Sequence, residues 1–380
     1  MFRHLVVSIC LLVGVVAAPA HSFDSGNAEF ALLMDADTGV ILYQKNADVR
    51  MSPASMSKLM TIFMVFEALE TDTLGLDEKL FVSDNAWKKG GAASGGSTMF
   101  LKARSEVSVE NLLRGVIVQS GNDACIVLAE ALGGSEENFA QMMTDRAREL
   151  GMTNSNFTNS TGIPDPNHKT TAHDLALLTR QIIMRFSGYY TLFSERSFTW
   201  NNIRQNNRNP LLYANIGADG LKTGHTQESG YGLVASAEQN GRRVIMVING
   251  LSSKRQRASE ARKMINWGQR NFSRETLVAG GETVTQLPVW HGTSTMVEVV
   301  PERRFDIIVP RIGQNKMVTS VIYEKPVLTP VKQGDKLAVM KVTLPNMATQ
   351  EMALVAANDV DRAGLLGRAI GSLQYLLFGQ

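Results

Sequence analysis

A change in residue pattern near Arg274 constrains the fold of this chain most, because the segments on its two sides have different periodicities. Before it, long apolar stretches with helical spacing stand between a few β-rich runs. From there to about Asn358, short runs rich in Val and Thr follow one another, such as residues 296–300, 305–309, 317–323 and 336–342. Regular short strands of this kind predict a small β-sandwich or barrel-like module. A chain of 380 residues is long enough for this module and a larger first domain.

The first domain has strand signals near both of its ends. Apolar runs at residues 30–34 and 40–43 flank an Asp/Gly turn, which is typical of a hairpin. Residues 231–237 and 243–249 predict two more strands, joined by a turn at 239–241. These runs predict one sheet that is closed by the N- and C-terminal segments of the domain.

The part of the chain between these strands is rich in helical patterns. Apolar residues at helical spacing predict helices from about 55 to 70 and from about 122 to 132. Residues 88–98 hold four glycines and two serines and predict a mobile surface loop. Helices packed on a sheet, followed by a β-rich module, predict an α+β fold class.

Both ends of the chain differ from the rest. Residues 1–20 combine a positive start, a 14-residue apolar stretch from Leu5 to Ala18 and small residues at a cleavage position, which predicts a signal peptide. Residues 361–380 have an amphipathic helical pattern, typical of a helix on a membrane surface or of one docked on its own domain. We therefore expect a mature chain of three parts, at residues 21–275, 276–360 and 361–380.

Composition excludes several classes of function. The net charge is +2, from 38 basic and 36 acidic residues, and no basic run is present, which argues against nucleic-acid binding. After signal cleavage Cys125 is the lone cysteine, so no intrachain disulfide can form. The six histidines show no metal-ligand spacing, and Leu221 precedes Lys222-Thr223 where a phosphate loop needs glycine. Neither a zinc hydrolase nor a nucleotide-binding site is indicated.

The segment Ser55-Met56-Ser57-Lys58 carries the first candidate chemistry. A serine at the start of a helix, with a lysine three residues later, places a hydroxyl and an amine on one face. Serine becomes an effective nucleophile when a base takes its proton, and lysine can be that base when burial or a nearby cation disfavours its charged form.

Two further motifs support this reading. Lys222-Thr223-Gly224 lies just before a predicted strand, where a lysine and a hydroxyl can hold a carboxylate and the glycine lets a substrate lie against the strand edge. A Ser-x-Asn motif occurs at Ser120-Gly121-Asn122, and also at residues 25–27 and 83–85. We favour Ser120 because it opens an apolar helix, whereas Ser83 lies in a polar stretch and is typical of a helix cap.

These motifs resemble those of the low-molecular-weight penicillin-binding proteins, the serine-type D-alanyl-D-alanine carboxypeptidases. The resemblance spans nearly the whole mature chain. The intervals of 65 residues from Ser55 to Ser120 and 102 from Ser120 to Lys222 fit the family and exclude Ser83. The matching blocks are Ser55 to Thr61, Gln119 to Ala124, Asn207-Arg208-Asn209, Gly220 to Thr226, and the stretch from Leu150 to Ala176. The fold implied is a β-lactamase/penicillin-binding-protein-like catalytic domain, an antiparallel sheet with helices, followed by a β-rich domain and a tail helix.

The resemblance also implies a role for each candidate residue. Ser55 would be the nucleophile, Lys58 its base and Ser120 a proton relay to the leaving amine. The remaining site residues would bind substrate: Asn122 its backbone, Lys222 and Thr223 with Gly224 its terminal carboxylate, and Arg257 the pocket around that carboxylate. The N–H groups of Ser55 and His225 would form the oxyanion hole. No metal or organic cofactor is implied.

The implied partners are peptidoglycan pentapeptides as substrate, β-lactam antibiotics as covalent inhibitors, and the membrane surface through the tail helix. Together with the signal peptide, this places the protein in the periplasm, peripherally attached to the inner membrane. Alternatives of the same fold are a β-lactamase and a D,D-endopeptidase, and a catalytically silent penicillin sensor is a third. His225 after the Lys-Thr-Gly motif resembles the carboxypeptidases, and no Glu-x-x-Leu-Asn-type segment stands between Ser120 and Lys222.

Overall fold

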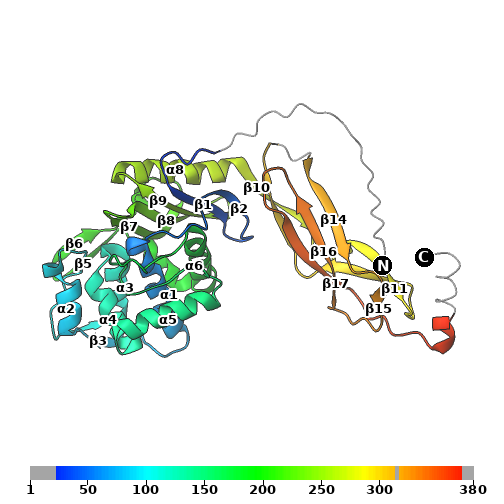
Figure 1. Ribbon diagram of the computed structural model, residues 1–380, viewed down its shortest axis with the longest axis horizontal. Coiled ribbons are helices and arrows are strands. Elements are labelled where there is room, and N and C mark those ends of the chain that lie inside the picture. Colours follow the sequence, from blue (N-terminus) through cyan, green and yellow to red (C-terminus); the bar gives the residue numbers. More distant parts are fainter. Residues whose placement is uncertain (1–22, 313–315, 370–380) are drawn as a thin grey trace.

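The structure is a computed structural model that describes residues 23–312 and 316–369 (Figure 1). The expected signal peptide at residues 1–20 lies outside the described residues, as does most of the expected tail helix. Residues 365–369 are helical, and Leu365 and Leu366 are 79% and 82% exposed. Within the described ranges, no helix is both long and apolar enough to cross a membrane.

The first domain is built on a five-stranded antiparallel sheet in the order β2-β1-β9-β8-β7. As predicted, the two ends of the domain meet in this sheet, because β1 from the N-terminal segment pairs with β9 from the C-terminal one. Asn240 and Gly241 have positive φ in the turn between β8 and β9, as a tight hairpin requires. The strands are β1 (Phe30–Asp35), β2 (Ile41–Lys45), β7 (Ala218–Thr226), β8 (Gly230–Gln239) and β9 (Arg242–Leu251).

Helices cover both faces of this sheet (Figure 1). Alternation along β1 shows the two layers, since Leu32 and Met34 belong to one buried cluster while Ala31 and Leu33 belong to the other. The first cluster lies under a group of helices: α1 (Lys58–Glu70), α2 (Asp84–Gly90), α3 (Val109–Arg114), α4 (Asn122–Gly133), α5 (Glu136–Glu149), α6 (Ala172–Arg185) and α7 (Ser187–Tyr190). The second cluster lies under α8 (Lys254–Asn271).

Short elements connect these helices. Four are 3₁₀ turns, η1 (Ala54–Ser57), η2 (Ala92–Ser94), η4 (Thr191–Ser194) and η5 (Pro210–Tyr213), and η3 (Gly115–Gln119) is a π-helical turn. Two small hairpin-like sheets pair β3 (Lys79–Phe81) with β4 (Glu106–Ser108), and β5 (Ser197–Trp200) with β6 (Ile203–Asn206).

The second domain is β-rich, as its residue pattern predicted. Helix α8 runs directly into β10 (Phe272–Val278), which pairs with β13 (Phe305–Pro310). A six-stranded sheet has the order β14 (Val318–Tyr323), β16 (Lys336–Thr343), β17 (Gln350–Ala356), β12 (Met296–Pro301), β11 (Thr285–Trp290) and β15 (Val327–Leu328). Both sheets share one buried apolar cluster. Arg274 also pairs with Asp37, which ties the start of this domain to the first.

Three local predictions differ from the structure. The helix expected from residue 55 begins at Lys58, and Ser55 lies in the 3₁₀ turn before it. Lys222-Thr223-Gly224 lies inside strand β7 instead of before a strand, because an edge strand can hold polar residues. The expected loop at 88–98 includes the end of α2 and the turn η2.

Asp123, at the start of α4, organises the segment that faces it. Its buried carboxylate accepts hydrogen bonds from Thr98 Oγ1, Met99 N, Leu101 N and Ala124 N, at 2.6 to 3.0 Å. Replacing Asp123 by alanine leaves these buried donors without an acceptor, and we expect a loss of about 3 kcal/mol in the free energy of unfolding. Urea unfolding followed by circular dichroism measures it.

The matched control is Asp77→Ala, which removes an exposed carboxylate in the same domain and should change stability by less than about 0.5 kcal/mol. Equal midpoints for the two variants would contradict a structural role for the Asp123 carboxylate.

Candidate active site

The turn η1 presents Ser55 at the N-terminus of the buried helix α1. Ala54, immediately before it, has a φ of 48°, which is rare for a residue with a Cβ and marks a constrained backbone. Ser55 is partly exposed, while Ser57 and Lys58 are fully buried. The sequence motif therefore gives one accessible hydroxyl with a buried amine beside it.

The amine of Lys58 has three polar neighbours. It donates to Asn122 Oδ1 at 2.8 Å and to the Thr161 carbonyl at 2.5 Å, and its Nζ lies 3.0 Å from Ser55 Oγ. A neutral amine has two N–H donors and one lone pair. With both donors taken by oxygens that can only accept, the lone pair faces the one neighbour that can donate, the Ser55 hydroxyl.

Burial favours the neutral form of this amine. Burial first, and then the charge of Arg208, lowers the pKa of Lys58 from 10.5 to about 8, against raising effects from Cys125, Asp123 and Glu136. Burial also raises the pKa of the Cys125 thiol to about 12, so this thiol stays protonated at neutral pH.

Ser120 lies where the π-helical turn η3 ends and α4 is about to begin. Its φ of 59° places it in the left-handed region, which interrupts the helix and lets its side chain leave the helical face. Lys222 Nζ donates to Ser120 Oγ at 2.8 Å. Burial first, and then the charges of Lys58 and Arg208, hold the pKa of Lys222 well below its usual value.

Strand β7 is the edge of the sheet nearest to Ser55, and Gly224 makes that proximity possible. A Cβ at Gly224 would lie 2.8 Å from the Pro53 carbonyl and 3.3 Å from the Cβ of Ala54. The absence of a side chain thus lets β7 pack directly against the turn that carries Ser55. We expected this glycine to make room for substrate, and the structure shows that it makes room for the protein's own backbone.

Arg257 provides a buried cation beside the end of β7. It is 7% exposed, its guanidinium lies 5.7 Å from the centre of the Tyr231 ring, and His225 stacks on the same ring at 3.8 Å. Its buried Nε has no hydrogen-bond partner among the described residues. Burial, and then the charge of Arg208, lowers the pKa of Arg257 to about 10 against an opposing effect of Tyr231. A buried donor of this kind is suited to an anionic ligand.

A loop that sequence reasoning assigned no role, residues 158–168, holds the other side of the Ser55 turn. The Thr161 carbonyl accepts from Lys58, and a Cβ at Gly162 would lie 1.9 Å from the Ala54 carbonyl. Gly162 has a φ of 79°, so both its conformation and its packing require glycine. The glycine was the available signal, whereas a backbone carbonyl leaves no trace in a sequence.

His168 fixes this loop to the same turn. Its Nδ1 accepts from Thr158 N at 3.1 Å, so the proton of the neutral ring is on Nε2, which lies 2.6 Å from Ser57 Oγ. Burial lowers the pKa of His168 to about 4. The histidine is therefore a neutral structural link between the loop and the Ser55 turn.

The two other Ser-x-Asn copies do not join this group. Ser83 caps α2 by accepting from Ala86 N at 2.9 Å, which confirms that it is a helix cap. Ser25 is bonded to Tyr43. Among the described residues, no group of histidine, cysteine, aspartate or glutamate side chains is arranged to hold a metal ion.

Comparisons with known proteins identify the family of this chain. Residues 16–253 match the D-alanyl-D-alanine carboxypeptidase family model, and residues 272–362 match that of the penicillin-binding protein 5 C-terminal domain. The chain is 38% identical over 347 residues to the D-alanyl-D-alanine carboxypeptidase DacC of Escherichia coli, covering 90% of this chain and 87% of the relative.

Two solved structures extend the match. Penicillin-binding protein 5 of Haemophilus influenzae superposes with a TM-score of 0.81 at 33% identity, over 91% of this chain and 100% of that one. Penicillin-binding protein D2 of Listeria monocytogenes, in its ampicillin-bound form, has a TM-score of 0.57 at 29% identity, over 66% of this chain and 100% of that one. The chain belongs to the serine-type D-alanyl-D-alanine carboxypeptidases, a family of low-molecular-weight penicillin-binding proteins, as its motifs predicted.

The pKa of Lys58 gives a pH prediction. The neutral amine makes up about one tenth of the total at pH 7 and rises as pH passes through 8, so the acylation rate of Ser55 should rise about tenfold per unit below pH 7 and level off near pH 9. Stopped-flow acylation by benzylpenicillin measures this rate. Lys58→Met, checked for folding by circular dichroism, should acylate slowly at every pH, and a flat wild-type profile between pH 6 and 9 would contradict the assignment.

Proposed function

We propose that the protein hydrolyses the bond between the two terminal D-alanines of peptidoglycan stem peptides, through an acyl-enzyme on Ser55. One observation carries this proposal. Both N–H donors of the neutral Lys58 amine are engaged by Asn122 and Thr161, and its one remaining partner is the Ser55 hydroxyl. By releasing D-alanine, the reaction would remove the D-Ala-D-Ala end that serves as donor in cross-linking. The reaction would therefore limit the cross-linking of peptidoglycan.

The first step is acylation. Ser55 Oγ attacks the carbonyl carbon of the penultimate D-alanine while its proton moves to the Lys58 lone pair. The developing oxyanion lies between the N–H groups of Ser55 and His225, since η1 and the edge strand β7 are in contact at Gly224. Each such donor typically stabilises the transition state by about 3 kcal/mol.

The leaving amine needs a proton, and Ser120 is placed to relay it. Because Lys222 donates to Ser120 Oγ, the hydroxyl proton of Ser120 is free to point elsewhere, toward the departing nitrogen. Ser120 regains a proton from Lys58, so the proton taken from Ser55 ends on D-alanine and Lys58 is neutral again. Water then attacks the Ser55 ester, Lys58 takes a proton from the water and returns it to Ser55 Oγ, and the shortened peptide leaves.

Recognition of the terminal carboxylate falls to the cations around β7. Lys222 and Thr223 are on the strand, and Arg257 is buried beside its end with an unused donor. Asn122 holds Lys58 through Oδ1, so its amide N–H group remains for the substrate backbone. This assignment gives every site residue named from the sequence a role in one reaction.

A β-lactamase is the closest alternative, and the chain lacks the Glu-x-x-Leu-Asn-type segment that would supply a deacylating glutamate between Ser120 and Lys222. Acylation by β-lactams is supported by the likeness to the ampicillin-bound Listeria protein. The intact set of motif residues argues against a silent penicillin sensor. A D,D-endopeptidase would use the same chemistry on a cross-linked peptide.

We also propose that the mature chain divides at about residues 275 and 360, works in the periplasm, and attaches to the inner membrane by its tail. The exposed Leu365 and Leu366 at the start of the tail support this attachment. The β-rich domain would then hold the catalytic domain away from the membrane.

Ser55→Ala should abolish the release of D-alanine from a D-Ala-D-Ala pentapeptide, because no other hydroxyl is paired with Lys58 in the described structure. Ser83→Ala is the matched control and should keep wild-type activity, since Ser83 serves as a helix cap. Measured D-alanine and mass spectrometry of the penicillin adduct give two readouts. An adduct on Ser55 that persists for minutes supports the carboxypeptidase, whereas its rapid loss would favour a β-lactamase.

Tail attachment predicts that the full mature chain binds phospholipid vesicles more strongly than a chain ending at Asp359. Flotation of both proteins with the same vesicles measures the difference. Equal partitioning would disprove the anchor and leave the enzymatic proposal untouched.

A further inference from the structure

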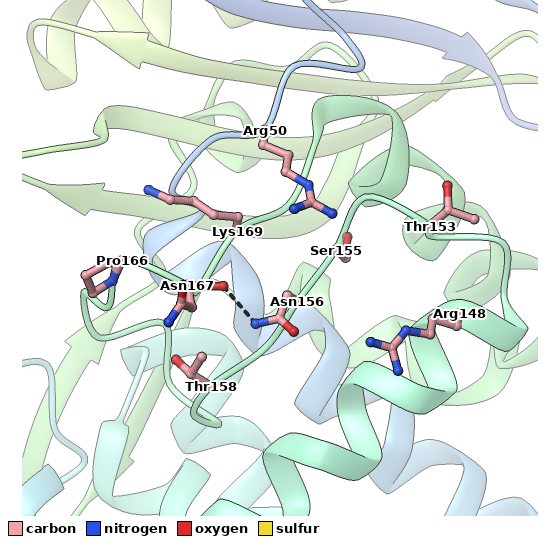
Figure 2. Close-up of a pocket in the computed structure, with 9 residues that line it drawn as sticks. All are labelled: Arg50, Arg148, Thr153, Ser155, Asn156, Thr158, Pro166, Asn167 and Lys169. Atoms are coloured by element: carbon pink, nitrogen blue, oxygen red, sulfur yellow. Dashed lines mark hydrogen bonds between the residues drawn. The ribbon is translucent and has the colours of Figure 1, made fainter.

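A polar cavity of about 510 Å³ opens beside α5, on the outer side of the loop that holds the Ser55 turn (Figure 2). Its size is within the usual range of ligand pockets. Its lining is unusual, because only one of the nine lining residues, a proline, is apolar. The lining residues are Arg50, Arg148, Thr153, Ser155, Asn156, Thr158, Pro166, Asn167 and Lys169.

The charges in this lining are all positive. Arg50, from the segment between β2 and η1, has no hydrogen bond or ion pair with any described residue. Arg148, near the end of α5, is paired with Asp145 at 2.8 Å through one nitrogen. Figure 2 shows the guanidinium groups of both arginines turned into the open space between the loop and α5. The Lys169 amine points away from that space, and it pairs with Glu228 at 3.1 Å.

We propose that this cavity, which we call the Arg50–Arg148 pocket, binds a carboxylate of the peptidoglycan polymer other than the one at Ser55. Each of the two guanidinium groups presents a planar set of N–H donors that can hold a carboxylate, and that of Arg50 has no partner among the described residues. The neutral amide and hydroxyl groups around them suit a peptide or sugar better than an apolar ligand. This inference rests on the proposed function, since stem peptides carry acidic side chains along the same polymer.

The pocket is connected to the active site by the loop they share. Thr158 lines the pocket and holds His168, whose ring is bonded to Ser57. Lys169 lines it too, and its partner Glu228 is in the turn after β7. A polymer with one stem peptide along β7 therefore has a second binding point on the outer side of this loop, which a short peptide cannot reach.

Binding can be tested without turnover by using Ser55→Ala protein. Co-sedimentation with purified sacculi should weaken about five- to tenfold in each of Arg50→Gln and Arg148→Gln, as expected for loss of one charge-assisted contact. Arg262→Gln is the control, because it removes the same charge from exposed surface on α8, across the sheet. Amidation of the carboxylates of the sacculi should have a similar effect. Ser55→Ala protein with both arginines intact should bind amidated sacculi as weakly as protein with both arginine substitutions binds untreated sacculi.

Turnover gives a second readout that separates this pocket from the active site. In the protein with Ser55 intact, each arginine substitution should raise KM for D-alanine release from sacculi about five- to tenfold. Activity on a soluble acyl-D-Ala-D-Ala tripeptide and acylation by benzylpenicillin should change less than about twofold, because neither ligand reaches the pocket.

Four outcomes would overturn the proposal: unchanged binding to sacculi, equal losses on sacculi and tripeptide, unaltered binding after amidation, or weaker binding of the arginine variants to phosphatidylglycerol vesicles but not to sacculi. The last result would assign the pocket to a lipid phosphate. If wild-type protein released no D-alanine from the tripeptide, the proposed function would fail, while co-sedimentation would still decide whether the pocket binds the polymer.

Discussion

The rest of the site depends on the burial of the Lys58 amine. A lysine with no exposed surface costs free energy if it is charged and unpaired, so the protein must either pair it or keep it neutral. Its hydrogen-bond partners are an amide oxygen, a backbone carbonyl and a hydroxyl, with no carboxylate among them. Without a carboxylate to hold the ammonium, burial lowers the pKa of this amine and raises the share of the neutral form, which is the form that can act as a base.

This arrangement explains why the site draws on four distant parts of the chain. The Ser55–Lys58 turn supplies the hydroxyl and the amine, α4 supplies Asn122, the loop at 158–168 supplies a carbonyl, and β7 supplies the edge. Two glycines at positions where a Cβ would collide, Gly162 and Gly224, let the loop and the strand close on this turn from either side. Local geometry at these two glycines therefore sets the distances at Ser55.

The sequence allowed the candidate side chains to be predicted, but not the backbone groups that position them. Ser55 and Lys58 were predictable because a spacing of three residues makes them neighbours on any helical turn. The Thr161 carbonyl was not, since every residue has a carbonyl and its use depends on tertiary contact. The sequence analysis also predicted no helix at α8, because its many charged residues leave only a narrow buried face.

The β-rich domain was predictable for a different reason. Its strands are short and separated by turn residues, so the period of two is visible locally and needs no long-range partner. The Lys222 motif shows the opposite case. Its strand β7 contains two glycines and a lysine within the motif region, which obscures the alternation, and only pairing with β8 defines it as a strand.

The positive charges around the site affect both the binding of the substrate carboxylate and the pKa of Lys58. Arg208, Lys222 and Arg257 carry charges that lower one another's pKa values or that of Lys58. A substrate carboxylate that binds among them is attracted by these charges, yet it also weakens the positive field that lowers the pKa of Lys58. Pairing with Arg257, beside the end of β7, would neutralise most of the charge of the carboxylate. The carboxylate would then have little effect on the pKa of Lys58. We propose that Arg257 makes this pairing through its buried Nε, which has no hydrogen-bond partner among the described residues. Binding and base activation therefore oppose each other least when recognition is concentrated on Arg257.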